Sequence, residues 1–271
     1  KTVNYTKLNF SSDPMLADSN LESISNLSQG IKSGRLDTLF ILGGDPVYTS
    51  PSDLDFASVI KLLKTSLHLT QKENSTSFAC NWVVPRSHYL ESWGDMLDVE
   101  GTAIIQQPVI RPMYSSITDI EFLNRLIKGS KSDYSLVRSY WRRGKGFDFE
   151  DTWNSWLHNG VNTDTKKLII TDYSVSFSFA FMASINAYFT SKKRSGLELF
   201  FVKDNSLYDG RFANNGWLQE LPDPITKLTW DNAVLISPAT AKELKLKSED
   251  KVSVTAGKRN LVAAIMVSPG H

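Results

Sequence analysis

Two glycines and an aspartate stand where the chain turns from an apolar run toward a helical pattern. The stretch "LFILGGDP" reads as a buried strand that stops at Gly43 and Gly44 and is followed by Asp45. In a parallel α/β sheet, ligands collect outside the carboxyl ends of the strands, so this turn lies at an edge where a ligand could bind. A tight strand-to-helix turn also requires glycine, so a purely structural role remains open.

Two carboxylates flank a Trp-Gly pair further along the chain. Glu91 and Asp95 lie in "ESWGD", and their spacing would allow an acid/base pair. The sequence shows no third residue that would act as their partner. The sequence therefore favours the alternative, a loop carboxylate that accepts backbone hydrogen bonds.

The histidines and the cysteine predict no metal or redox centre. The chain has four histidines, His68, His88, His158 and His271. They fall in four different predicted elements without the spacing of metal ligands, so each is expected to be structural or exposed. Cys80, the one cysteine, lies in the apolar strand pattern "ACNWVVP", where it would act as a small hydrophobe. A lone cysteine excludes an intrachain disulfide and an iron–sulfur cluster built from this chain alone. We therefore expect the chain to bind no metal, flavin or nicotinamide.

A long irregular stretch, "DGRFANNGWLQELPDPITKLTWDNA", runs from Asp209 to Ala233. Loops of this length inside a compact domain are usually functional or disordered, and the apolar content here argues against disorder. We predict an ordered wall in which Trp217 and Trp230 are largely buried. Replacing Trp217 by alanine would then cost about 3–5 kcal/mol. The candidates for a polar interface network are Asn214, Asn215 and Gln219.

Composition and charge describe a globular chain of 271 residues, 41% of them apolar, with a formal net charge of +1. This balance encodes no strong attraction to nucleic acid or to an acidic membrane surface. The basic residues Arg138, Arg142, Arg143 and Lys145 are expected to form a solvated helix face and loop. No uncharged apolar run is long enough to span a membrane. The nearest, Leu168 to Phe189, is broken by Asp172 and predicts a strand followed by a buried helix.

The first half of the chain has the pattern of a doubly wound parallel sheet. Helical spacing up to Ile31, with Gly34 behind it, is followed by the strand before the glycine turn. A helical pattern then leads to the strands "SLHLT" and "ACNWVVP". The glycine turn is expected to follow a central parallel strand. Thr118 and Glu121 form a capping box that predicts the start of a further helix.

The second half predicts helices and then strands. "SDYSLVRSYWRR" and "DFEDTWNSWLHNG" read as helices, the second ending at Gly160. Four strand-like runs follow, "LELFFV", "AVLIS", "KVSVTA" and "LVAAIMV", with one helix from Pro238 to Leu244. We therefore predict an α/β fold in three regions: a partial Rossmann-like domain over 1–130, a helical bridge over 131–195 and a partial β-barrel over 196–271. The chain opens at "KTVNYT" without Met and closes on "VSPGH", so it is expected to be a fragment.

Several of these stretches resemble a known superfamily. "LFILGGDPVYTSP", "VVPRSHYLESWGD" and "IIQQPVIRPMY" resemble the second Rossmann-like half of the molybdopterin oxidoreductases. "ISPATAKELKLKSEDKVSVTAG" is similar to their molybdopterin dinucleotide-binding β-barrel. "ESWGD", "PGH" and the loop from Asp209 to Ala233 resemble the molybdopterin-like iron–sulfur subunit of bacterial alternative complex III, a quinol:electron acceptor oxidoreductase.

The resemblance implies a non-catalytic scaffold portion of a subunit in a respiratory, quinol-oxidising electron-transfer complex. Such a subunit lies at the periplasmic face of the cytoplasmic membrane, in the bacterial cell envelope, with other subunits of the complex as partners. The resemblance implies no cofactor in this chain, no nucleic acid partner and no direct membrane span. It places iron–sulfur clusters elsewhere in the full-length subunit. The alternative is a fragment of an active molybdopterin oxidoreductase that lines molybdopterin guanine dinucleotide. An unrelated α/β binding module is a third reading.

The resemblance also implies a set of vestigial pterin-side positions: Gly43, Gly44, Asp45, Glu91, Asn214, Asn215 and Gln219. Asp45 stands where many relatives have Asn, and its carboxylate would repel a phosphate. Asn81 stands near a position where active relatives often keep Asp. The loop from Asp209 to Ala233 would be a vestigial cofactor cover that faces the strand ends near Gly44 and Glu91.

Overall fold

The structure is a computed structural model that describes residues 20–98, 101–143, 145–146, 148–165, 179–190, 196–257 and 259–270. The chain divides into two compact units, Lys1–Glu198 and Leu199–His271, called here the first and the second unit. The strand predicted at Leu168 and the histidine His271 lie outside the described residues. The three regions predicted from the sequence stay a prediction.

The first unit contains a parallel sheet with the strand order β1-β2-β3. Its strands are β1 (Thr38–Leu42), β2 (Thr65–Thr70) and β3 (Trp82–Pro85). Between them lie α2 (Pro46–Thr49), η3 (Ser52–Leu54), α3 (Phe56–Ile60) and α4 (Ser75–Ala79). The predicted alternation of helices and parallel strands is confirmed.

The glycine turn follows an edge strand of the described sheet, and the prediction of a central strand is wrong. β2 is the central strand, and β1 pairs only with β2 among the described residues. A continuous apolar run such as "TLFIL" is typical of a strand covered on both faces, which says nothing about neighbours on its two edges. Strand β3 is also shorter than predicted, because Cys80 is the C-cap of α4.

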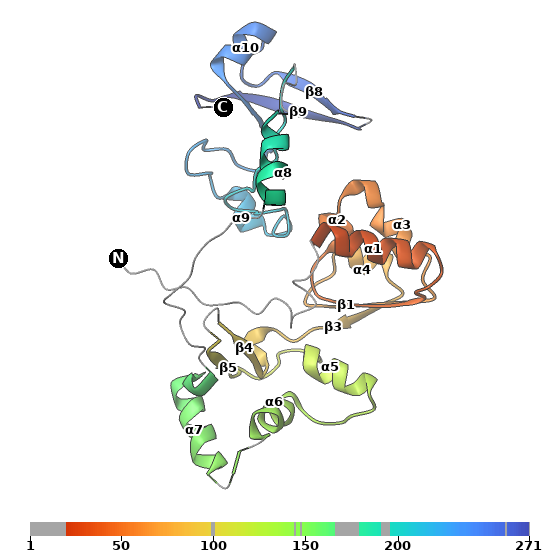
Figure 1. Cartoon of the computed structure of the whole chain (residues 1–271), viewed down its shortest axis with the longest axis vertical. Coiled ribbons are helices and arrows are strands. Elements are labelled where there is room, and N and C mark those ends of the chain that lie inside the picture. The colour runs from red at the N-terminus through yellow and green to blue at the C-terminus, as the bar shows by residue number, and fades with distance from the viewer. Residues whose placement is uncertain are drawn as a thin grey trace. The chain divides into compact units, whose positions relative to one another are not determined.

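Helices cover both faces of this sheet (Figure 1). On one face, α1 (Asn20–Lys32) and α3 pack against Leu39 and Ile41 of β1. On the other face, Phe122 of α5 (Asp119–Leu126) packs with Leu69 of β2, and its ring meets Phe40 edge-on at 5.6 Å. Helices on both faces are what the pattern of a doubly wound sheet predicts. Successive strand residues point to opposite faces, which gives each helix layer its own core.

A second core in the first unit joins a small antiparallel sheet to two helices. The sheet has the order β4-β5-β6, with β4 (Gly94–Leu97), β5 (Ala103–Gln106) and β6 (Val161–Asn162). Helices α6 (Asp133–Arg142) and α7 (Phe149–Asn159) contribute Val137, Phe149, Trp153 and Trp156 to the core, and β5 contributes Ile105. Short 3-10 turns, η4 (Tyr89–Glu91) and η5 (Thr163–Thr165), flank this sheet, and α8 (Phe179–Thr190) completes the described part of the unit.

Local signals in the sequence place several helix ends correctly. The Thr118 hydroxyl accepts a hydrogen bond from the Glu121 amide, and the Glu121 carboxylate accepts one from the Thr118 amide, as the capping box predicts. Gly160 ends α7 in the left-handed conformation at φ +73°, which glycine adopts without strain. These helix ends depend only on neighbouring residues, which is why the sequence predicts them.

The basic cluster lies on α6 and the following loop, as expected, and it also covers aromatic rings. The guanidinium carbons of Arg138 and Arg142 lie 5.4 and 5.9 Å from the centre of the Phe149 ring. Lys145 lies 5.4 Å from the centre of the Trp156 ring. Arg138 also pairs with Glu150. These cations shield the second core from water through their stems while their charges remain outside.

The second unit contains an open sheet with the order β7-β9-β8. Strands β7 (Val234–Ile236), β8 (Lys251–Ala256) and β9 (Arg259–Val267) lie where they were predicted, as does α10 (Pro238–Leu244). These strands do not close into a barrel. The run "LELFFV" forms no strand, so that prediction is wrong, and Phe200, Phe201 and Val202 are exposed. A strand needs a hydrogen-bonding neighbour, and the described residues supply none for this run.

Candidate functional site

The glycine turn is a left-handed bend at the carboxyl edge of the parallel sheet. Gly43 and Gly44 have φ angles of +78° and +75°, which disfavour any residue with a Cβ. The Gly43 amide donates to the Leu69 carbonyl at 2.8 Å, so the bend is attached to the central strand. The amides of Gly44 and Asp45 have no acceptor among the described residues.

Asp45 fastens this turn to α4. Its Oδ1 accepts from the Thr76 hydroxyl at 2.6 Å, from the Thr76 amide at 3.0 Å and from the Tyr48 amide at 3.4 Å. The Thr76 hydroxyl, which is fully buried, accepts in turn from the Val47 amide at 3.1 Å. The Asp45 carboxylate is therefore an N-cap for α2 and an anchor for α4 at once.

Arg86 is the residue that the sequence interpretation missed. It follows β3 directly, and its Nε and Nη2 atoms donate to the two Asp119 oxygens at 2.7 and 2.5 Å. A Cβ atom added to Gly43 would lie 2.5 Å from Arg86 Nη1, so the guanidinium lies next to the first glycine of the turn. A basic residue at the end of a neighbouring parallel strand is a signal that could have pointed to it, because such strand ends meet at one edge.

His68 of β2 is buried on the face of the sheet that carries α4. Its side chain is 0% exposed, and Nδ1 lies 2.9 Å from the Ser77 hydroxyl oxygen. Nε2 has no hydrogen-bond partner among the described residues. Burial lowers the pKa of His68, and the carbonyls of Gly44 and Gly43 together with the Asp45 charge oppose that shift. The expectation of a structural histidine is confirmed.

The stability of the first unit is expected to fall below the ordinary histidine pKa of about 6.5. The unfolded chain binds a proton at His68 there, whereas the folded state, with its lowered pKa, stays neutral. Stability from this residue is therefore complete above that pH and declines below it, by at most about 1.4 kcal/mol per pH unit. Urea unfolding between about pH 5.5 and 8 measures this slope. His68→Gln should flatten it, and an unchanged slope in that variant would contradict the assignment.

Glu91 is a loop carboxylate, as the sequence favoured. Its two oxygens accept from the His88 and Met113 amides, each at 3.0 Å, and these bonds hold the pKa of Glu91 below its ordinary range. Asp95 instead accepts from the Trp141 indole N–H at 2.7 Å. The two carboxylates have separate partners and no hydrogen bond joins them in the described structure. An acid/base pair is not formed.

Other residues singled out in the sequence have structural partners. Asn81 accepts from the Ser66 amide at 2.8 Å and from the Ser66 hydroxyl at 2.9 Å, so it ties the start of β3 to β2. Cys80 packs against the core formed by α1 and α3, as a small hydrophobe would. Burial raises the pKa of its thiol. The described residues contain no group of three or more His, Cys, Asp or Glu that could hold a metal ion.

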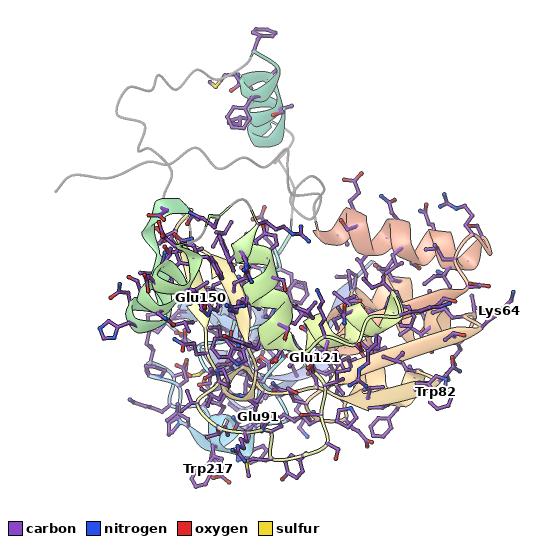
Figure 2. The ribbon with its side chains drawn as sticks, turned by 90° about the horizontal axis from the view of Figure 1, so that it is seen from below. Lys64, Trp82, Glu91, Glu121, Glu150 and Trp217 are labelled. Atoms are coloured by element: carbon purple, nitrogen blue, oxygen red, sulfur yellow. The ribbon has the colours of Figure 1, made fainter. Side chains whose placement is uncertain are left out.

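The loop of the second unit is ordered by polar contacts, and its indoles face outward. Asn215 caps α9 (Gly216–Glu220), and the side-chain amide of Gln219 donates to the Ala213 carbonyl at 3.1 Å. Trp217 is 87% exposed and Trp230 is 61% exposed, so the prediction that both are buried is wrong (Figure 2, where Trp217 is labelled). The physical reason is that the loop's own caps fix its backbone without an apolar layer over the indoles. Asn214 is exposed as well.

Asp223 is the centre of this loop, and it too was missed. One oxygen accepts from the Ile225 amide, the Thr226 amide and the Thr226 hydroxyl, at 2.9, 2.7 and 2.9 Å. The other accepts from the Asn205 side chain at 2.9 Å. These bonds lower the pKa of Asp223 strongly. The sequence signal is "PDPIT", in which an aspartate bonds the backbone two residues on, the pattern of an Asx turn.

Removing the Asp223 carboxylate is expected to loosen the loop without unfolding the second unit. In Asp223→Ala, the amides of Ile225 and Thr226 lose their acceptor and should exchange with solvent faster, by on the order of tenfold. Amide hydrogen exchange followed by mass spectrometry measures this. Asp231→Ala is the control, because the described structure shows no hydrogen bond to that carboxylate. Equal exchange in both variants would count against the role of Asp223.

The carboxyl edge of the parallel sheet does not fit the pyrophosphate of a pterin dinucleotide. A pyrophosphate needs a surplus of N–H donors and positive charge. Here two carboxylates, Asp45 and Asp119, accompany one guanidinium, and Arg86 already gives two donors to Asp119. Only the Gly44 and Asp45 amides remain without acceptors at the turn itself, among the residues that the structure describes.

Comparison with known proteins supports the fold and nothing finer. No protein-family model matches the chain, and neither does any curated protein. Among solved structures it is similar to the acetylene hydratase from Pelobacter acetylenicus, with a TM-score of 0.56 and 12% sequence identity. The similarity covers 90% of this chain and 37% of that structure. At this level of identity the similarity shows a shared fold and nothing about activity or cofactor. No helix in the described parts of the chain is long and apolar enough to cross a membrane.

Proposed function

We propose that this chain is a non-catalytic, molybdopterin-oxidoreductase-like scaffold within a subunit of a respiratory, quinol-oxidising electron-transfer complex. The observation that carries the proposal is the carboxyl edge of the parallel sheet. At the edge where such a sheet binds ligands, Asp45 is bonded to Thr76 and Arg86 is bonded to Asp119. Charged groups that a cofactor would use are engaged in holding the fold together.

The further parts of the proposal rest on the family resemblance of the sequence. The partners are other subunits of the same membrane-bound complex, and the location is the periplasmic face of a bacterial cytoplasmic membrane. Iron–sulfur clusters elsewhere in the complete subunit would carry the electrons, and this chain would position them. Exposed Phe201, Trp217 and Ile225 in the second unit offer apolar surface of the kind that subunit contacts cover.

The test is a cofactor analysis of the complete subunit, purified in the complex from its native membrane. The proposal expects iron in stoichiometric amounts, molybdenum and tungsten below stoichiometry, and no fluorescent pterin released on oxidation. Quinol-oxidising activity should purify with the subunit. Activity that separates fully from the subunit would remove the respiratory part of the proposal.

The alternative function is the lining of a bound pterin dinucleotide in an active molybdopterin oxidoreductase. The left-handed bend at Gly43 and Gly44, with two amides that have no acceptor in the described parts of the chain, is the observation that favours it. Stoichiometric molybdenum or tungsten together with released pterin would establish this alternative and refute the scaffold.

A further inference from the structure

The Gly43–Gly44 turn has the features of an anion cradle. Two successive left-handed residues leave the amides of Gly44 and Asp45 without acceptors in the described structure. Consecutive amides in such a bend form a concave site that attracts negative groups. The bend also lies at the carboxyl edge of the parallel sheet, where ligands bind.

The side chain of Arg86 lies beside the first glycine of this cradle. Arg86 Nη1 occupies the space next to Gly43, as the 2.5 Å approach to an added Cβ shows. No atom of the described residues lies within 4 Å of a Cβ added to Gly44, so the crowding is specific to the first glycine. Gly43 therefore has two reasons to be glycine, its φ angle and Arg86, whereas Gly44 has only the first.

Asp119 holds Arg86 in this position. The pair is bidentate, and both side chains are about one-third exposed, at 34% each. Asp119 is the first residue of α5, behind the capping box of Thr118 and Glu121, so its backbone is fixed independently of the pair. The guanidinium is thus oriented by a rigid helix start, and its charge is balanced by a carboxylate.

We propose that the Arg86–Asp119 pair keeps the glycine cradle closed to phosphate-like anions, and that the cradle becomes an anion site when the Asp119 carboxylate is replaced by a neutral group. The guanidinium that covers Gly43 is then free to turn toward an anion bound at the two amides. This inference deepens the proposed scaffold function and rests on it, because an intact pair leaves no place for a cofactor phosphate. The same pair adds a second reason for glycine at position 43, beside its φ angle.

The first test is a comparison of two glycine variants in two backgrounds. Gly43→Ala should lower the Tm more than Gly44→Ala, by roughly 3 °C or more, since both incur the same φ strain and only the first meets Arg86. In an Arg86→Ala background the two losses should become equal. A difference that is absent in the parent chain, or that persists without Arg86, would overturn the inference.

The second test uses pyrophosphate as the probe in isothermal titration calorimetry. Asp119→Asn should bind pyrophosphate at least about tenfold more tightly than the parent chain, a gain of about 1.4 kcal/mol. Asp37→Asn is the matched control, because it removes the carboxylate of an exposed pair with Lys64 at 3.2 Å. That control should bind like the parent, and circular dichroism should show α5 intact in Asp119→Asn.

The outcomes separate this inference from the proposed function. Tight pyrophosphate binding by the parent chain, or no gain in a folded Asp119→Asn variant, would overturn the closed cradle. If the variant with both Asp119→Asn and Arg86→Gln still binds pyrophosphate more tightly than the parent chain, the role assigned to the guanidinium is overturned. The proposed function is decided separately, by the metal and pterin content of the complete subunit.

Discussion

Replacing Trp153 by alanine is expected to lower the free energy of unfolding of the first unit by about 3–5 kcal/mol. Trp153 is 1% exposed, and its ring lies 5.9 Å from Phe149, 6.3 Å from Tyr134 and 6.5 Å from Trp156, between ring centres. Truncation would leave a cavity between α6 and α7 that the rigid aromatic neighbours cannot fill. Urea unfolding followed by far-ultraviolet circular dichroism measures the loss.

Two variants control this prediction. Trp217→Ala removes the same side chain from a site that is 87% exposed, and it should change stability by no more than about 0.5 kcal/mol. Trp153→Phe keeps most of the ring and removes an indole N–H that has no partner among the described residues, so it should cost much less than alanine. Similar losses of stability in the Trp153 and Trp217 alanine variants would contradict the prediction, because they would mean that burial of the indole does not decide its contribution.

The contrast between these two tryptophans shows what the sequence contains about the fold. Trp153 and Trp156 recur at helical spacing in "DFEDTWNSWLHNG", so periodicity alone predicts that they face one core. Trp217 lies in a stretch without periodicity, and only its apolar character argued for burial. Apolar character is weak evidence, because much of any protein surface is apolar.

Elements that depend on neighbouring residues were predictable, and contacts between distant segments were not. The capping box at Thr118 and the helix end at Gly160 are written in residues three or four apart. The edge position of β1 depends on which strands pair, and the Arg86–Asp119 contact joins residues 33 positions apart. A single sequence gives no direct signal for such pairs, and parallel sheets consist largely of them.

The same limit applies to the candidate site. The glycine turn and Glu91 were recognised because a strand end and a loop carboxylate have local patterns. Arg86 and Thr76 were missed because their importance comes from what they touch across the sheet. Asp45 was interpreted as a charge facing a ligand, whereas the structure directs it inward to Thr76.

This inward contact is expected to stabilise the fold, and Thr76→Val tests it. Valine has nearly the shape of threonine, so the variant removes the hydroxyl and little else. Asp45 would lose its shortest hydrogen bond, at 2.6 Å, and the Val47 amide would lose its acceptor in a fully buried place. A hydrogen bond to a charged group is worth about 1.5–3 kcal/mol, and the free energy of unfolding should fall by that amount.

Thr38→Val is the matched control for this loss. The Thr38 hydroxyl also donates to a carboxylate, that of Asp37 at 3.0 Å, but this contact is exposed to water. Water replaces a lost partner there, so the control should change stability by less than about 0.5 kcal/mol. Thr76→Ser, which keeps the hydroxyl and gives up a methyl group, should recover most of the loss. If the two valine variants unfold alike, the hydrogen bonds of the Thr76 hydroxyl with Asp45 and Val47 do not stabilise the attachment of the glycine turn to α4, and the bond from the Thr76 amide to Asp45 at 3.0 Å would be what holds it.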